Sequence, residues 1–393
     1  MKLYPFPLKL KTDNPDDNKS LSSDKERVGM SSLFLKVIRP LPLTDTEFTG
    51  EDLSVVKSLG IRHYLFPLVY ARLQNLGNSI ENRKGVDDFL KETERLYLKS
   101  VSRSARQEAV ENEVTLLLLQ KGIRSIVIKG NRLANEIFQD PNCRVSSDID
   151  ILIPKVDAVE VDCILQEQGY QGDAIAPVKY CLSRIHHAIY RHPGNNMLVE
   201  IHWHFGVPYF FRLTSDEIWR EVKANDSGAM MLSPEMTLVM LLIHHHSHSF
   251  RELKILVDIL WTLYRYESVI DWRHFAMKIR KAGLVKTTLI SLHQIKTLWK
   301  EAPYDLKSFR ALEQEINNTG YSIPSIVLSY FRMDIHKDKA QNIYKDKLIA
   351  RFALDSRSDI LLSFPKTLFP VPEAIRELYR DGRNWTLPLN YLK

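Results

Sequence analysis

Residues 126–153 read IVIKGNRLANEIFQDPNCRVSSDIDILI, and the last six residues of this stretch decide the fold. There Asp148 and Asp150 alternate with isoleucines. Because successive side chains of a strand point to opposite faces, this spacing predicts a strand with both carboxylates on one face and the isoleucines against a core. Two like charges this close together are costly unless a cation lies between them. The stretch therefore predicts a divalent metal site.

A phosphate site is predicted just upstream of that strand. A short β-branched run at residues 126–128 meets Lys129 and Gly130, and a helix-like segment, NRLANEIF, follows. Glycine permits close approach of a ligand to the backbone, and the N-terminus of a helix attracts phosphate. We therefore expect Lys129 and Gly130 to bind a triphosphate opposite the carboxylates.

Two residues between this helix and the strand are further candidates for nucleotide binding. Arg144 precedes Asp148 by four residues. We expect Arg144 to contact the phosphates or to order the loop, and a surface ion pair with Asp140 or Glu136 is the alternative. Ser146 is expected to hydrogen-bond the backbone of the same loop.

A third carboxylate comes from a neighbouring strand. Strand candidates at residues 186–192 and 197–204 flank the turn signal Pro-Gly-Asn-Asn. In the second candidate, Glu200, His202 and His204 share one face, and apolar side chains share the other. A glutamate in such a strand is not explained by packing, so we predict that Glu200 completes the metal site. We expect His202 to line the same cleft; a partly buried histidine bonded to the backbone is the alternative for both histidines.

Taken together, these motifs resemble those of a known family. The succession K-G, R-x-S-x-D-I-D-I-L and V-E-I-H-W is similar to the uncharacterised nucleotidyltransferase family of the DNA polymerase beta superfamily. The resemblance spans roughly residues 110–260, and the segment FPVPEAIRELY resembles the family's C-terminal part more loosely. It implies an α+β fold, in which a minimal polymerase-beta-like nucleotidyltransferase palm, a mixed sheet with flanking helices, is embedded between helical lobes.

The resemblance also implies roles for the residues above. Asp148, Asp150 and Glu200 would be the catalytic metal ligands, and Lys129 and Gly130 would touch the triphosphate. The expected cofactor is Mg²⁺, as two ions, with Mn²⁺ as a substitute. The expected reaction moves a nucleoside monophosphate from a triphosphate such as ATP to a hydroxyl acceptor and releases pyrophosphate. The acceptor stays open among RNA, a protein and a small molecule.

Two other functions stay open beside this one. The first is a non-catalytic module that uses the same fold to bind a nucleotide or a partner. The second is a metal phosphohydrolase built on His244, His248 and Asp258. The run HHHSH at residues 244–248 puts its first and last histidines one helical turn apart. It lacks the nearby acid of an H-E-x-x-H zinc site, so we favour a helix whose polar face closes over the nucleotide. Lys254 could reach a phosphate from that region.

Bulk composition limits the remaining possibilities. The chain has 393 residues, 44% of them hydrophobic, and a net charge of +6. This charge permits a phosphate-bearing partner but supports nucleic-acid binding only weakly. The three cysteines have no paired spacing, and neither a signal peptide nor a membrane span is recognisable. We therefore expect a cytoplasmic protein without a membrane partner.

Pattern changes along the chain predict five segments. We expect a disordered tail at residues 1–30, an N-terminal helical lobe at 31–122, the nucleotidyltransferase palm at 123–225, a second helical lobe at 226–300, and a helical or irregular segment at 301–393.

Overall fold

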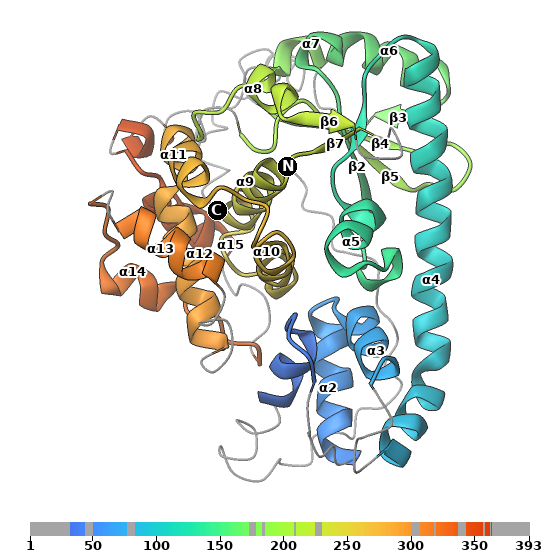
Figure 1. Cartoon of the computed structure of the whole chain (residues 1–393). Coiled ribbons are helices and arrows are strands. Elements are labelled where there is room, and N and C mark those ends of the chain that lie inside the picture. Colours follow the sequence, from blue (N-terminus) through green and yellow to red (C-terminus); the bar gives the residue numbers. More distant parts are fainter. Residues whose placement is uncertain are drawn as a thin grey trace, which may run out of the picture.

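The computed structural model describes residues 32–43, 50–76, 83–172, 178–182, 185–207, 210–224, 230–299, 307–317, 320–336, 343–356, 358–361 and 363. The expected tail at residues 1–30 and the segment FPVPEAIRELY lie outside these ranges. Within them the fold is α+β, as expected: a mixed five-stranded sheet is flanked by many helices (Figure 1). No helix in the described ranges is long and apolar enough to cross a membrane.

The five-stranded sheet has the order β1-β2-β5-β4-β3. Its strands are β1 (Ile126–Val127), β2 (Asp148–Leu152), β3 (Gln171–Gly172), β4 (His187–Arg191) and β5 (Leu198–His202). β2 and β5 are parallel neighbours, whereas the other pairs are antiparallel. The strands predicted at the aspartate pair and on both sides of the Pro-Gly-Asn-Asn turn are confirmed as β2, β4 and β5. The register sets Asp150 beside Glu200, so acids from two strands meet on one face.

A single long helix supports both the N-terminal helices and the sheet (Figure 1). The helices of this part are α2 (Gly50–Arg62), α3 (Phe66–Gln74) and α4 (Arg83–Gln120). Near its start, α4 contributes Val86 and Phe89 to the core that it shares with α2 and α3. Near its end, Val110, Val114 and Leu118 pack in the core that covers the sheet. Their spacing of four residues places them on one helix face, so the last turns of α4 lie along the sheet.

The sheet has one apolar face and one polar face. Ile149 and Ile151 of β2 and Val199 and Ile201 of β5 are buried in the same core as the end of α4. The acids alternate with these residues and therefore point to the other side. The other elements around the sheet are α5 (Gly130–Phe138), η1 (Pro141–Cys143), η2 (Lys155–Asp157), α6 (Ala158–Glu167), α7 (Val178–Cys181), α8 (Ser215–Arg220), β6 (Val222–Ala224) and β7 (Met230–Leu232).

The second half of the chain is helical. Ser233 caps α9 through a hydrogen bond from the backbone N–H of Met236, and Pro234 occupies the first turn, where both residue types are favoured. α10 packs against both α9 and α5, which brings it close to the polar face of the sheet. These elements are α9 (Pro234–Ser247), α10 (Leu253–Arg265), α11 (Trp272–Ala282), α12 (Val285–Leu298), α13 (Lys307–Asn317), α14 (Ser325–Tyr330), α15 (Ile343–Ala350) and η4 (Arg351–Ala353).

Candidate active site

Three acids predicted from the sequence share the polar face of the sheet. Asp148 and Asp150 belong to β2, and Glu200 is the direct neighbour of Asp150 in β5. Burial raises the pKa of Asp148, and the charges of Asp150 and Glu200 raise it further. The ligand atoms of Asp150 and Glu200, together with a ring nitrogen of His202, lie within 4.8 Å of one another, which is close enough to share an ion. The acids come from parallel strands, so their relative positions are fixed by backbone hydrogen bonds.

Lys129 lies among these acids. Its Nζ is 2.5 Å from Oδ1 of Asp150, and both side chains are almost completely buried. Burial alone would lower the pKa of Lys129, but the charges of Asp150, Asp148 and Glu200 raise it. Lys129 stands at the positive end of α5, where a cation requires a compensating anion. In this structure Asp150 is that anion.

His202 links the acids of the two strands. Its Nε2 is 2.9 Å from Oδ1 of Asp150 and 3.2 Å from Oε2 of Glu200, and the ring is buried. Burial lowers the pKa of His202, but the hydrogen bonds to both carboxylates outweigh this and raise it. Of the two interpretations offered for this residue, the structure supports a place among the acids. His204 fits the alternative interpretation, a histidine bonded to the backbone. Its ring nitrogens face the backbone oxygens of Gly206 and Leu213, at 2.8 and 2.7 Å.

The charge balance leaves Asp150 with one free acceptor. Although burial would raise the pKa of Asp150, Lys129 and His202 hold it below its usual range. The pKa of Glu200 is also lowered, because the bond from His202 and the nearby His187 outweigh burial. Oδ2 of Asp150 is buried and has no hydrogen-bond partner. Carboxylate oxygens are the ligands that Mg²⁺ prefers, so Asp150 and Glu200, whose ligand atoms lie within 4.8 Å of one another, fit a magnesium ion, with the unpaired Oδ2 of Asp150 available to it.

The structure overturns one of the two expectations for Arg144. The predicted surface pair with Asp140 or Glu136 is wrong, because Nε of Arg144 lies 2.9 Å from Oδ2 of Asp258, and both side chains are buried. The acid comes from α10, far along the chain, so local spacing gave no signal for it. Glu136 instead accepts a hydrogen bond from Tyr266. Arg144 thus fastens the loop before β2 to α10.

The loop from Arg144 to Ser147 is held from several sides. The hydroxyl of Ser146 donates to Oδ1 of Asp148 at 3.0 Å, so this residue orients an acid of the site. Gln107 of α4 donates to the backbone oxygen of Ser146. Lys254 of α10 donates to the backbone oxygen of Val145, and burial with the nearby Arg144 lowers its pKa to about 8. Sequence reasoning did not find the role of Gln107, because an isolated glutamine in a long helix is ordinarily solvated.

Glu111 of α4 is a second residue that the sequence did not reveal. It is buried beside Gly130, whose φ is +64°, and a Cβ at Gly130 would lie 3.3 Å from Oε1 of Glu111. Burial raises the pKa of Glu111 to about 7, helped by Glu108 and Asp150. Gly130 is therefore required by both its backbone angle and its surroundings. Its position next to Lys129 at the start of α5 agrees with the prediction.

The histidine run of α9 does not form the metal site considered above. His245 bonds Ser291, and His246 bonds the backbone oxygen of Ala350, so both are core residues. Asp258, the expected third ligand, pairs with Arg144. In the part of the chain that the structure describes, only two groups of three possible ligands are close enough to share an ion, and neither includes residues of this run. The groups are Asp150, Glu200 and His202, and His186, His187 and His202.

Comparison with known proteins gives one match. Residues 50–300 match the model of a family described as uncharacterised nucleotidyltransferase, and this range includes every site residue above. Neither the curated proteins nor the solved structures contain a match to the chain.

Proposed function

Because the chain belongs to this nucleotidyltransferase family, we propose that it is a Mg²⁺-dependent enzyme that transfers a nucleoside monophosphate from a nucleoside triphosphate to a hydroxyl acceptor and releases pyrophosphate. The observation that supports this proposal most strongly is the meeting of Asp148, Asp150 and Glu200 on one face of parallel strands. A free buried oxygen of Asp150 adds to it. ATP is the first nucleotide to test.

The three acids would hold the metal. Two Mg²⁺ ions, or Mn²⁺ in their place, would lower the pKa of the acceptor hydroxyl and neutralise charge on the triphosphate. His202 keeps Asp150 and Glu200 at a fixed separation by bonding both. Ser146 fixes Asp148 in the same way. The protein therefore supplies a set of oxygens whose positions do not need to reorganise during the reaction.

The nucleotide would lie at the start of α5. Gly130 turns the backbone there with a φ of +64°, and the N-terminus of a helix favours the negative charge of phosphate. The ammonium of Lys129, already buried beside Asp150, can exchange this carboxylate for a phosphate oxygen. Arg144 acts on the nucleotide through the loop that it anchors, because its own charge is paired with Asp258.

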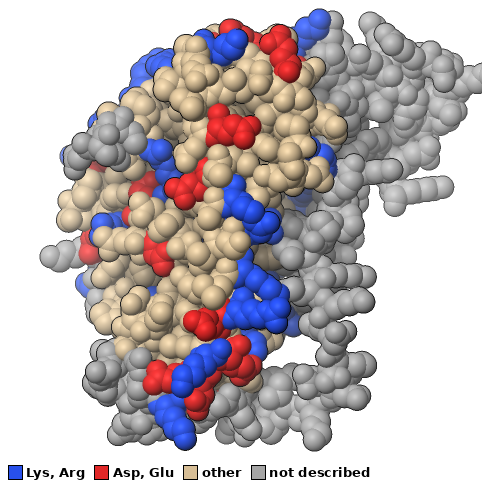
Figure 2. All heavy atoms as spheres, turned by 90° about the vertical axis from the view of Figure 1, so that its right-hand side faces the viewer, with Lys and Arg blue, Asp and Glu red and all other residues tan. Residues whose placement is uncertain are grey.

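A row of basic residues on α4 indicates the kind of acceptor. Between Arg95 and Arg106 the sequence RLYLKSVSRSAR has four basic residues and no acid. None of them forms an ion pair with an acid in the described ranges. Figure 2, in which α4 faces the viewer, shows Lys and Arg side chains in a row on this side of the molecule. Arg103 reaches the backbone oxygen of Ser147, next to the first acid. The row therefore favours an acceptor that carries negative charge, such as RNA.

The cellular setting belongs to the same proposal. Cys143 is buried and Cys163 is exposed, and neither is in a disulfide. Free thiols suit a reducing compartment, so we place the enzyme in the cytoplasm.

The experiment is a transfer assay with nucleoside triphosphates labelled at the α-phosphate, Mg²⁺ and fractionated cell extract. We expect label on one class of molecule with wild type and none with Asp148→Asn or Asp150→Asn, which keep the shape of the side chain. Asp157→Asn, in η2, is the matched control and should transfer normally. Transfer by both site variants at the wild-type rate would refute the assignment. Nucleotide binding without transfer to any fraction would favour the non-catalytic module.

A further inference from the structure

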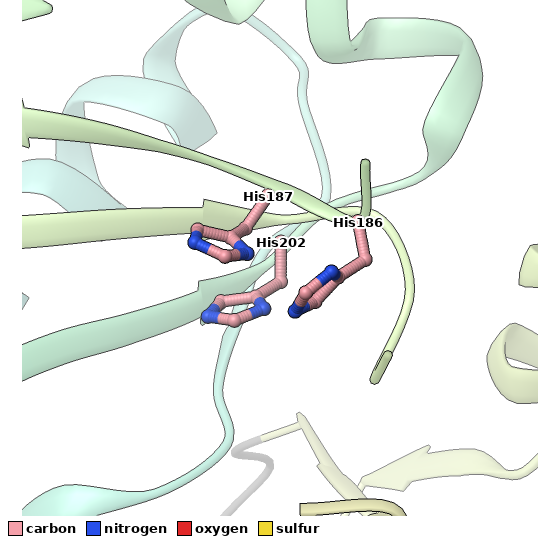
Figure 3. Close-up of side chains that lie close together, drawn as sticks. All are labelled: His186, His187 and His202. Atoms are coloured by element: carbon pink, nitrogen blue, oxygen red, sulfur yellow. The ribbon is translucent and has the colours of Figure 1, made fainter. Parts of the chain in front are cut away.

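Three imidazole rings gather where β4 begins and β5 ends. His186 immediately precedes β4, His187 is its first residue, and His202 is the last residue of β5 (Figure 3). The register pairs His187 with His202, and the backbone N–H of Trp203 bonds the oxygen of His186. The positions of all three residues are thus fixed by the sheet. Each ring offers a nitrogen, and these three nitrogens lie within 4.8 Å of one another.

Two of the rings carry a buried nitrogen without a hydrogen-bond partner. Nε2 of His202 faces Asp150 and Glu200, while its Nδ1 is buried without a hydrogen-bond partner. Nδ1 of His187 is also buried and without a partner. A buried polar atom without a partner costs roughly 1–3 kcal/mol, so a fold tolerates it mainly where something binds. The close-up shows the rings of His186 and His187 turned toward the ring of His202 (Figure 3).

We propose that His186, His187 and His202 bind a divalent transition metal ion such as Zn²⁺, beside the carboxylates that are assigned to magnesium. Imidazole nitrogen is a ligand for Zn²⁺, Cu²⁺ and Ni²⁺, whereas Mg²⁺ prefers oxygen. Histidines that bind metal usually donate their other N–H to a carboxylate, which fixes the ring. His202 has this arrangement with Asp150 and Glu200. Three nitrogen ligands leave one position of a zinc ion open for water or for an oxygen of a substrate.

The three rings need to move only slightly to bind a zinc ion. Zn–N bonds of about 2.0–2.1 Å in a tetrahedral site put the ligand nitrogens roughly 3.4 Å apart. The nitrogens here lie within 4.8 Å of one another, and the ring centroids of His186 and His187 are 4.3 Å apart. Rotations of the side chains that move each nitrogen by about 1 Å close the site, without any change in the backbone.

An anion is a poorer occupant of this cluster than a metal ion. A phosphate would need charged imidazoles. Nδ1 of His187 and Nδ1 of His202 are buried, and burial disfavours the charged form of an imidazole. A neutral imidazole offers the lone pair that a metal requires. The ammonium of Lys129 is balanced by Asp150.

The first test needs only the wild-type protein. Full-length protein stripped with a chelator and loaded with one equivalent of Zn²⁺, without nucleotide, is measured by X-ray absorption at the zinc edge. We expect the scattering of three imidazoles. A spectrum with one imidazole and several oxygens would overturn the proposal, since it would place zinc on Asp150, Glu200 and His202. No binding of zinc would overturn it as well.

The second test compares variants by titration with Co²⁺, whose visible absorption reports nitrogen ligands in a tetrahedral site. His186→Ala and His187→Ala should each weaken binding at least about tenfold, because even residues that only support a metal ligand contribute that much. Asp148→Asn should bind Co²⁺ as wild type does while losing nucleotide transfer, so this proposal and the proposed function can fail separately. His248→Ala, at the end of α9, is the control for loss of a histidine. Equal binding by wild type and both cluster variants would refute the site.

Discussion

Replacing Lys129 with methionine tests the charge balance of the site. Nζ of Lys129 lies 2.5 Å from Asp150, and the side-chain exposures are 9% and 1%. Removing one partner of a buried ion pair costs about 3–5 kcal/mol, because the other charge stays buried. His202 still donates to the same carboxylate. We therefore expect Lys129→Met to lose a free energy of unfolding near the lower end of that range, about 3 kcal/mol, in metal-free buffer.

The loss should depend on pH in a defined direction. The pKa of Asp150 lies below its usual range in the folded protein. Its charge therefore adds stability above the unfolded pKa of about 3.9, and this contribution disappears as the pH falls through the folded pKa. In Lys129→Met, Asp150 takes up a proton at higher pH than in wild type. The difference in stability between the two proteins should therefore shrink from neutral pH toward about pH 4.

Thermal unfolding with EDTA and with Mg²⁺ measures both effects. Without the ammonium, a metal ion meets no competing cation, so Mg²⁺ should raise the melting temperature of Lys129→Met more than that of wild type. Lys155→Met, an exposed lysine of η2, is the control and should melt as wild type does. If Lys129→Met melts at the wild-type temperature in EDTA and responds equally to Mg²⁺, then Lys129 does not balance Asp150.

Three further results are expected. Arg144→Met or Asp258→Asn alone should cost about 3–5 kcal/mol by leaving one buried charge, whereas the double variant should lose much less than their sum; equilibrium unfolding in urea measures the coupling, and additive losses would contradict the pair. Gly130→Ala should lose about 1–3 kcal/mol, because φ is +64° and Glu111 is close; unchanged stability and transfer would show that this glycine is dispensable. Glu111 has a pKa raised to about 7, so stability should fall by up to about 3 kcal/mol as the pH rises from about 4.5 to 7; a pH series of melting curves in which Glu111→Gln retains that fall would exclude this source.

The sheet and its acids could be predicted because their signals are local. Alternation of Asp148 and Asp150 with isoleucines specifies a strand and its polar face, and the turn after β4 specifies a hairpin. The parallel pairing of β2 with β5 follows less directly. The family resemblance implied only a mixed sheet, and two strands about fifty residues apart can pair in many ways. Glu200 was placed correctly because it interrupts an apolar strand.

The residues that surround the acids could not be predicted in the same way. Glu111 and Gln107 come from α4, and Asp258 and Lys254 come from α10. Each is a polar residue in an amphipathic helix, where a solvated position is the usual outcome. Only the packing of both helices against the loop before β2 turns them inward. The sequence also gave Arg144 a local partner, since it contains no sign of which distant acid is buried beside it.

The position of Lys129 gives a physical reason for the Lys-Gly opening of this site. A lysine at the start of a helix is unfavourable next to the helix dipole, and here Asp150 compensates for it. A divalent ion at the same carboxylate would repel the ammonium, and a triphosphate bound at the start of α5 offers it another anion. The lysine would then leave the acid when metal and nucleotide arrive together. The metal ion alone would displace the ammonium from Asp150 without offering it another anion, and the nucleotide alone would offer an anion without displacing it. On this argument, Mg²⁺ and nucleotide bind cooperatively in wild type, and Lys129→Met should reduce that coupling.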